Sequence, residues 1–250
     1  MHVHYGLEQA IYIPHSSAEG LIKNMDRRGI KMSIISSLQA MHSDGLMGNK
    51  LLKEIIKQYP CHFKGYWSIN PNYCNEFYMQ IQEFSKTEFV GFKFWSEYHK
   101  YPLTGKKYEP ALRYAEEHDL LILMHVWKYN IGKEGKEIYN TPSMVGALAK
   151  KYPNITFIMG HAGYGEWEKA IAVANKYSNV YLDITSSYRV NGVVEWLVKD
   201  VGSDRVLFGT DTPWFDPYCG IGCILFSKIT DEDRHNIFHR NAERILKKYM

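Results

Sequence analysis

Residues 120–126 read LLILMHV and residues 155–161 read ITFIMGH, two short runs that are apolar at nearly every position. Runs of this kind are typical of strands that are buried on both faces of a parallel sheet. Between them, Thr141-Pro142 has the residues of a helix start, a capping side chain followed by proline in the first turn. The segment therefore predicts a strand, a crossover helix and a second, parallel strand.

The same alternation extends along the whole chain. Runs of strand length recur roughly 25–35 residues apart. We expect strands at 2–5, 32–36, 63–69, 89–95, 120–126, 155–159, 180–184 and 206–208. This rhythm predicts an α/β fold, a single (β/α)₈ TIM-type barrel domain over residues 1–250, with its active site at the C-terminal ends of the strands. A doubly wound open sheet is the competing fold, but no glycine-rich turn follows the first strand.

Composition narrows the class of protein. The 30 basic residues nearly balance the 27 acidic ones, so there is no reason to expect nucleic acid or an anionic membrane as a partner. The apolar runs are too short to span a bilayer, and no secretory signal is visible. Four cysteines are too few for a disulfide scaffold in 250 residues. We expect a cytoplasmic protein that acts on a small molecule, with a homodimer left open.

Histidine and carboxylate residues stand where four expected strands end. His2 and His4 share one face of the first strand, because successive side chains alternate between faces. His125 closes the fifth strand, His161 the sixth and Asp211 the eighth. In a barrel these ends surround one mouth. Since imidazole and carboxylate groups are common zinc ligands, the pattern predicts a metal-dependent enzyme.

With its neighbouring segments, this pattern resembles the amidohydrolase superfamily, in particular the branch related to aminocarboxymuconate semialdehyde decarboxylase. The resemblance covers essentially the whole chain. It rests on the segments HVH at 2–4, GFK at 91–93, MH at 124–125, GHAG at 160–163, FGTD at 208–211 and NAERIL at 241–246. The last two segments are quite specific when they occur together.

The resemblance implies that His2, His4, His125 and Asp211 hold one divalent ion, with zinc expected first. A zinc-bound water has a pKa of about 7, which supplies hydroxide at neutral pH. Asp211 would then act as general base, and His161 would steer the water or stabilise charge on a carbonyl oxygen. The expected activity is hydrolysis of an amide, a lactone or another carbonyl-type bond in a small organic substrate.

Three alternatives stay open. Close relatives use the same ligands for non-oxidative decarboxylation of unsaturated or aromatic carboxylic acids. The histidines could also serve a metal-independent lactonase, or the barrel could bind a ligand without catalysis. The last alternative follows from the position of His2, because only Met1 precedes it. Either the first strand is short or the recorded start lies downstream of the natural one, and ligands close to a terminus are weakly held.

Lys93, Trp127 and Arg189 are the candidate substrate-binding residues. Lys93 shares a strand face that can turn into the barrel, where it would bind a substrate carboxylate or pair with Asp211. In some two-metal members of the superfamily a carboxylated lysine bridges a second metal, which Lys93 could do here. Arg189 follows the seventh strand and could clamp a carboxylate in bidentate fashion. Trp127 belongs to a set of aromatic residues expected at the barrel mouth, the others being Tyr12, Trp67, Trp95, Tyr98, Tyr188 and Trp214.

Two further pairs are expected to play no part in the site. His235 and His239 have the i, i+4 spacing of a helical metal pair, but the glutamate of the zinc-protease motif is missing between them. We interpret them as surface residues of the last helix. Cys219 and Cys223 have no second cysteine pair nearby, which argues against a structural zinc site.

Overall fold

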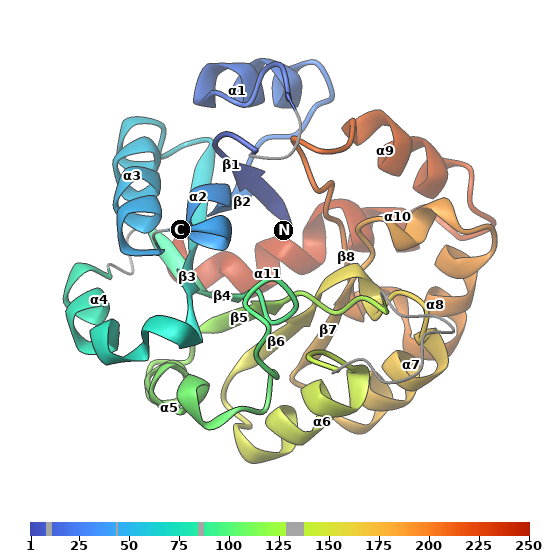
Figure 1. Ribbon diagram of the computed structural model, residues 1–250. Helices are drawn as coiled ribbons and strands as arrows, with labels where there is room; N and C mark the ends of the chain where they lie inside the picture. The colour runs from blue at the N-terminus through green and yellow to red at the C-terminus, as the bar shows by residue number, and fades with distance from the viewer. Residues whose placement is uncertain (9–11, 44, 85–87, 129–137) are drawn as a thin grey trace.

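The computed structural model describes residues 1–8, 12–43, 45–84, 88–128 and 138–250. Eight parallel strands follow one another in chain order within a single sheet, which confirms the predicted TIM-type barrel. The strands are β1 Val3–Tyr5, β2 Ser33–Ser37, β3 Phe63–Ile69, β4 Phe89–Phe94, β5 Leu121–Met124, β6 Thr156–Met159, β7 Val180–Asp183 and β8 Val206–Leu207. Figure 1 shows the strands at the centre and most helices around them.

The barrel closes between β1 and the segment that follows β8. The backbone N–H of His4 donates to the Thr212 carbonyl at 2.7 Å. The N–H groups of Thr210 and Asp211 donate to the His2 carbonyl at 3.2 and 3.0 Å. His4 lies on β1 and His2 directly precedes it; both are fully buried and their backbones are hydrogen-bonded, so neither is on a loose end. Closure thus brings together His4 and Asp211, which are 207 positions apart.

The α-helices lie mostly in the outer layer of the barrel (Figure 1). They are α1 Ala18–Asp26, α2 Leu38–His42, α3 Gly45–Gln58, α4 Phe77–Glu83, α5 Glu109–Glu117, α6 Pro142–Lys151, α7 Trp167–Lys176, α8 Val193–Val201, α9 Pro217–Leu225, α10 Asp231–His235 and α11 Asn241–Leu246. The helix start predicted at Thr141 is confirmed, since its side chain accepts from the Met144 N–H. Within the described ranges, no helix combines the length and apolar character needed to cross a bilayer.

The strands are packed tightly from both sides. Every residue of β2, β4 and β5 is buried, as expected for strands between a barrel interior and a helical layer. Gly91 on β4 approaches β5 so closely that a Cβ atom there would lie 1.8 Å from the Leu121 carbonyl oxygen. Only glycine therefore fits this position. The same strand then carries Lys93 into the barrel interior.

Candidate metal centre

His2, His4 and Asp211 converge at the barrel mouth. One ligand atom of each lies within 4.8 Å of the others, and all three residues are buried. The Nε2 atom of His4 is 2.9 Å from Oδ1 of Asp211, and Nε2 of His2 is 3.7 Å from the same oxygen. Within the part of the chain that the structure describes, this is the one group of three such residues with a metal-ligand spacing.

The outer nitrogens of both histidines have their own partners. Nδ1 of His2 is 2.6 Å from Oδ2 of Asp183 at the end of β7. Nδ1 of His4 is 2.8 Å from the Ser36 hydroxyl on β2. Contacts of this kind orient a metal-binding imidazole and place its proton on the outer nitrogen. With the proton on Nδ1, the Nε2 atom of each histidine can bind an ion. Without one, Nε2 of His4 is within hydrogen-bond distance of Asp211, at 2.9 Å, and Nε2 of His2 is 2.9 Å from Nζ of Lys93.

These contacts provide a test of whether the residues fit a metal ion. Two imidazole lone pairs and a carboxylate oxygen are all acceptors, and they meet in a buried space. Three acceptors in a buried space need a cation or protons between them, and here a proton on Nε2 of His4 and the Lys93 amine can meet only part of that need. A divalent ion satisfies all three at once, and nitrogen with carboxylate oxygen is a donor set that zinc and related ions accept. The donor chemistry therefore fits such an ion.

Charge is distributed unevenly over this group. Although burial alone would raise the pKa of Asp211, the hydrogen bond from His4 and the neighbouring His161 and Lys93 lower it below its ordinary value. Burial raises the pKa of Asp183 to about 6. Burial is also the main reason why the pKa of His2 lies well below its ordinary value. Asp211 is thus the anion of the group and His2 is neutral at pH 7.

Lys93 lies beside the candidate ligands. Its Nζ atom is 2.9 Å from Nε2 of His2 and 4.2 Å from the ring centre of Trp95. The side chain is fully buried, which lowers its pKa to about 7 against the opposing charges of Asp211 and Asp183. The side chain does turn into the barrel, but it does not line the pocket described below.

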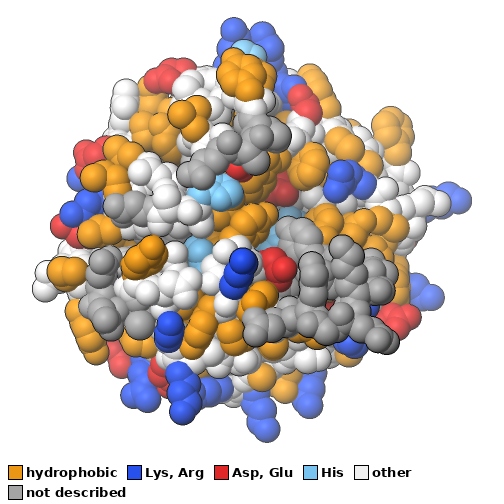
Figure 2. Space-filling view, in the orientation of Figure 1, with side chains coloured by type: hydrophobic (Ala, Val, Ile, Leu, Met, Phe, Trp, Pro, Cys, Tyr) orange, Lys and Arg blue, Asp and Glu red, His pale blue; other side chains and the backbone are white. Residues whose placement is uncertain are grey.

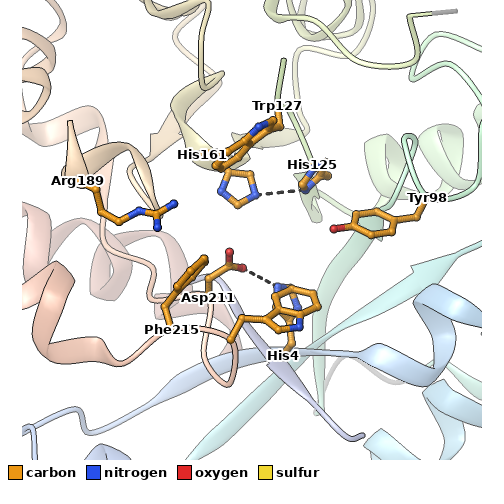
Figure 3. A pocket seen from close by; sticks show the side chains of 9 residues that line it. His4, Tyr98, His125, Trp127, His161, Arg189, Asp211 and Phe215 are labelled. Atoms are coloured by element: carbon orange, nitrogen blue, oxygen red, sulfur yellow. Dashed lines mark hydrogen bonds and ion pairs between the residues drawn. The ribbon is translucent and has the colours of Figure 1, made fainter. Parts of the chain in front are cut away.

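His125 and His161 form a pair of their own. Nε2 of His161 lies 3.2 Å from Nδ1 of His125, and Nδ1 of His161 lies 3.2 Å from the Thr185 carbonyl. Burial lowers the pKa of His161 to about 4 and that of His125 well below its ordinary value. In Figure 3 this pair faces the His4–Asp211 pair across an open space. His125 is not part of the three-residue group, so its role as a fourth ligand stays a prediction.

The backbone at two of these positions is strained. His161 and Asp211 both adopt a φ of 58°, in the left-handed region that non-glycine residues rarely occupy. Such a conformation costs about 1–3 kcal/mol and is found preferentially at active sites and ligand clamps. The fold thus holds both side chains at the mouth at some expense of stability.

The open space is a pocket of about 280 Å³ above His4 and Asp211. Four aromatic side chains contribute to its wall: Tyr98, Trp127, Trp214 and Phe215. Figure 3 shows the Arg189 guanidinium and the Tyr98 hydroxyl directed toward the space from opposite sides. In Figure 2, histidine side chains are visible near the centre of this face, among hydrophobic ones. The pocket thus joins a flat apolar wall to one cation and the candidate metal ligands.

Two of the three residues predicted to bind substrate line the pocket. Trp127 and Arg189 line the pocket, whereas Lys93 lies behind the candidate ligands. Tyr98 and Trp214 also line it, as expected for residues of the mouth. The remaining aromatic candidates do not line it: Tyr12 is exposed, Trp67 and Tyr188 are buried, and Trp95 is buried against His4, with the two ring centres 5.0 Å apart. A position at the end of a strand therefore does not by itself distinguish aromatic residues that line the pocket from those that do not.

Sequence reasoning missed three residues of the site. Asp183 supports His2, Ser36 supports His4, and Phe215 lies 4.6 Å under the Arg189 guanidinium. Asp183 carried a usable signal, because an acidic residue inside an apolar run needs a buried partner. Ser36 and Phe215 carried none, since serine at a strand end and phenylalanine in a loop are common.

The comparisons with known proteins agree with this architecture. Residues 77–248, more than half of the chain, match the family model described as Amidohydrolase. The chain belongs to the amidohydrolase family. A structure of an uncharacterised TIM-barrel protein from Bordetella bronchiseptica is similar with a TM-score of 0.76 at 20% identity, covering 94% of this chain and 84% of that one.

Two further relatives are decarboxylases. Gamma-resorcylate decarboxylase of Polaromonas sp. JS666 is 27% identical over 124 residues, 42% of this chain and 38% of that protein. The match thus spans less than two fifths of that curated relative. A dihydroxybenzoic acid decarboxylase from Polaromonas sp. JS666, solved with manganese and the inhibitor 2-nitroresorcinol, has a TM-score of 0.65 at 18% identity and covers 92% of this chain and 86% of that one.

Proposed function

We propose that this protein is a divalent-metal-dependent, non-oxidative decarboxylase of a small aromatic carboxylic acid. The observation that carries the proposal is the pocket, in which an aromatic wall and the Arg189 guanidinium stand over His4 and Asp211. Two named relatives are decarboxylases, one of them with bound manganese. They support the decarboxylase alternative over the hydrolysis that the sequence indicated first.

The proposed ligands of one ion are His2, His4 and Asp211, with His125 as the fourth. When bound, the ion would act as a Lewis acid on substrate oxygens and orient the substrate. Manganese in a relative makes Mn²⁺ a candidate beside Zn²⁺. A second ion bridged by a carboxylated Lys93 is less favoured, since the described residues bring together one three-ligand group.

The remaining residues of the pocket bind the substrate and move a proton. Trp127 and Phe215 would hold the flat ring and exclude water, and Arg189 would pair with an anionic oxygen. In the reaction the bond between the ring carbon and the carboxylate carbon breaks, CO₂ leaves, and a proton arrives at the ring carbon. We assign this proton transfer to Asp211, which is anionic at pH 7 and would first take up a proton from water and then pass it to the ring carbon, with His161 facing the same space.

A product analysis tests the proposal. The full chain, loaded with Mn²⁺ or Zn²⁺, is incubated with 2,6-dihydroxybenzoate and 5-carboxyvanillate, and with aryl amides and lactones of similar size. We expect CO₂ release from at least one acid, loss of that activity with a chelator, and recovery when the metal is restored. Hydrolysis of an amide or lactone without CO₂ release would favour the first prediction from the sequence. Lactone hydrolysis that survives the chelator would favour the metal-independent alternative.

A further inference from the structure

A second histidine pair lies on the outer surface, on the helical segment after β8. His235 ends α10, and His239 belongs to the π-helical turn Asn236–Arg240 that leads into α11 (Figure 1). Nδ1 of His235 is 3.3 Å from Nε2 of His239, and the ring centres are 5.6 Å apart. Both side chains are exposed, so solvent ions can reach them. The two rings are therefore in contact, which their sequence spacing alone did not establish.

The distance between the two nitrogens is that of a chelate. Two nitrogens bound to one tetrahedral ion at about 2.0–2.1 Å stand about 3.3–3.4 Å apart. The separation of 3.3 Å between the His235 and His239 nitrogens matches this value. An ion of this kind can therefore bind both rings with little movement of either side chain.

A carboxylate supports the second histidine from behind. Oε1 of Glu243 lies 3.0 Å from Nδ1 of His239, one helical turn further along. This contact keeps a proton on Nδ1 and leaves the Nε2 lone pair directed at His235. A carboxylate in this position is the usual outer partner of a metal-binding imidazole, because it orients the ring and makes it more basic.

The other charges of the segment are engaged elsewhere. Arg240 pairs with Glu232, and Arg234 donates to Asp231 at 2.8 Å. Asp233 is part of the capping box with Thr230 at the start of α10. The cations nearest in sequence are thus partly neutralised, and among the described groups the carboxylate that contacts the histidine pair is Glu243.

The backbone between the two histidines is tied to the barrel, so metal binding by the pair should affect the stability of the fold. Ile237 in the π-helical turn is fully buried, and its carbonyl accepts the N–H of Phe208 just after β8. An ion held by His235 and His239 would join the two sides of this turn. Because binding to the folded state alone adds stability, metal addition should raise the melting temperature.

We propose that His235 and His239 form a surface site for a divalent transition-metal ion that prefers imidazole, such as Ni²⁺, Zn²⁺ or Cu²⁺, with water completing its coordination. Imidazole pairs suit these ions, whereas Mg²⁺ and Ca²⁺ prefer oxygen ligands. The site is separate from the candidate metal centre. Whether it binds metal does not depend on the proposed decarboxylase activity.

Calorimetric titration of the full chain with NiCl₂ at pH 7.5 tests the proposal. We compare the parent with His235→Gln, His239→Gln, the double variant and Glu243→Gln, with His62→Gln as the control. Each single histidine variant should bind Ni²⁺ at the site of His235 and His239 at least tenfold more weakly than the parent. The double variant should lose little more, because a chelate needs both rings. Glu243→Gln should lose at least threefold, and His62→Gln less than twofold.

Two further measurements separate this site from the candidate centre. Asp211→Asn should weaken Ni²⁺ binding at the candidate centre and leave the site of His235 and His239 within twofold of the parent. The melting temperature of each variant without metal establishes that it is folded. If His235→Gln and His239→Gln both bind Ni²⁺ within twofold of the parent in affinity and stoichiometry, the proposal is overturned. It is also overturned if His62→Gln causes an equal loss.

Discussion

Oδ2 of Asp183 lies 2.6 Å from Nδ1 of His2, so a carboxylate at the end of β7 holds an imidazole beside β1. Thr185 in turn donates its hydroxyl to the other carboxylate oxygen at 2.8 Å. Both partners are fully buried. Because this contact sets the direction of the His2 Nε2 lone pair, the metal affinity of the centre depends on a residue that would not touch the ion.

Replacing Asp183 by Asn tests this dependence. The amide is nearly the same size but is a weaker acceptor, so Mn²⁺ or Zn²⁺ affinity at the centre should fall by about 10–100-fold. Titration calorimetry measures the loss, and Asp204→Asn, remote from the mouth, serves as the control. An unchanged affinity in Asp183→Asn would show that Asp183 does not orient His2.

Replacing Arg189 by Gln should mainly weaken substrate binding. The guanidinium faces the pocket and is the cation among the residues that line it. Loss of a charge-assisted hydrogen bond costs about 1.5–3 kcal/mol, so KM for an aromatic acid should rise at least tenfold. Steady-state kinetics measure this, with the exposed Arg113→Gln as the control. A fall in kcat at constant KM would instead assign Arg189 to the chemical step.

Replacing each of two glycines by alanine should change the free energy of unfolding in opposite directions. At Gly91 a Cβ atom would lie 1.8 Å from the Leu121 carbonyl oxygen, and such overpacking should cost about 3 kcal/mol of unfolding free energy. At Gly222 in α9 a Cβ atom meets nothing within 4 Å, and alanine should add up to about 1 kcal/mol. Urea unfolding compares both variants with the parent. Equal effects would contradict the packing described for β4 and β5.

Stability should depend on pH through His99. Burial lowers the pKa of His99 to about 4, although its ring contacts the Met41 carbonyl. Since the unfolded chain binds a proton near pH 6.5, the contribution of neutral His99 is complete above that pH and is lost as the pH falls toward 4.

At pH 5 this loss amounts to about 2 kcal/mol. We measure the free energy of unfolding in urea at pH 7.5 and at pH 5. The loss between these pH values should be about 2 kcal/mol smaller in His99→Gln than in the parent. The other buried histidines contribute equally to both proteins and cancel in the comparison. If the two proteins lose the same free energy between these pH values, His99 is not responsible.

The fold was predictable because its signals are local. Apolar runs such as 120–124 and the capped helix start at Thr141 each lie within a few residues, and their repetition indicated the barrel. The site was predictable only in part. His2, His4 and Asp211 stand at strand ends and do converge, whereas Lys93 lies behind the pocket and not in its wall. Which side of a strand end faces the pocket depends on twist and packing, which no short segment contains.

The sequence by itself determined which side chains stand at the ends of strands, because strand length and the alternation of faces are properties of neighbouring residues. The tertiary structure alone decided which of them meet. His4 and Asp211 are 207 positions apart, and they come within 2.9 Å because the barrel closes through hydrogen bonds between β1 and residues 210–212. The partners Asp183 and Ser36 arrive from β7 and β2, which are the neighbours of β8 and β1, the two strands that meet at that closure. Contacts of this kind arise from closing the sheet, so they become visible only once all eight strands are in place.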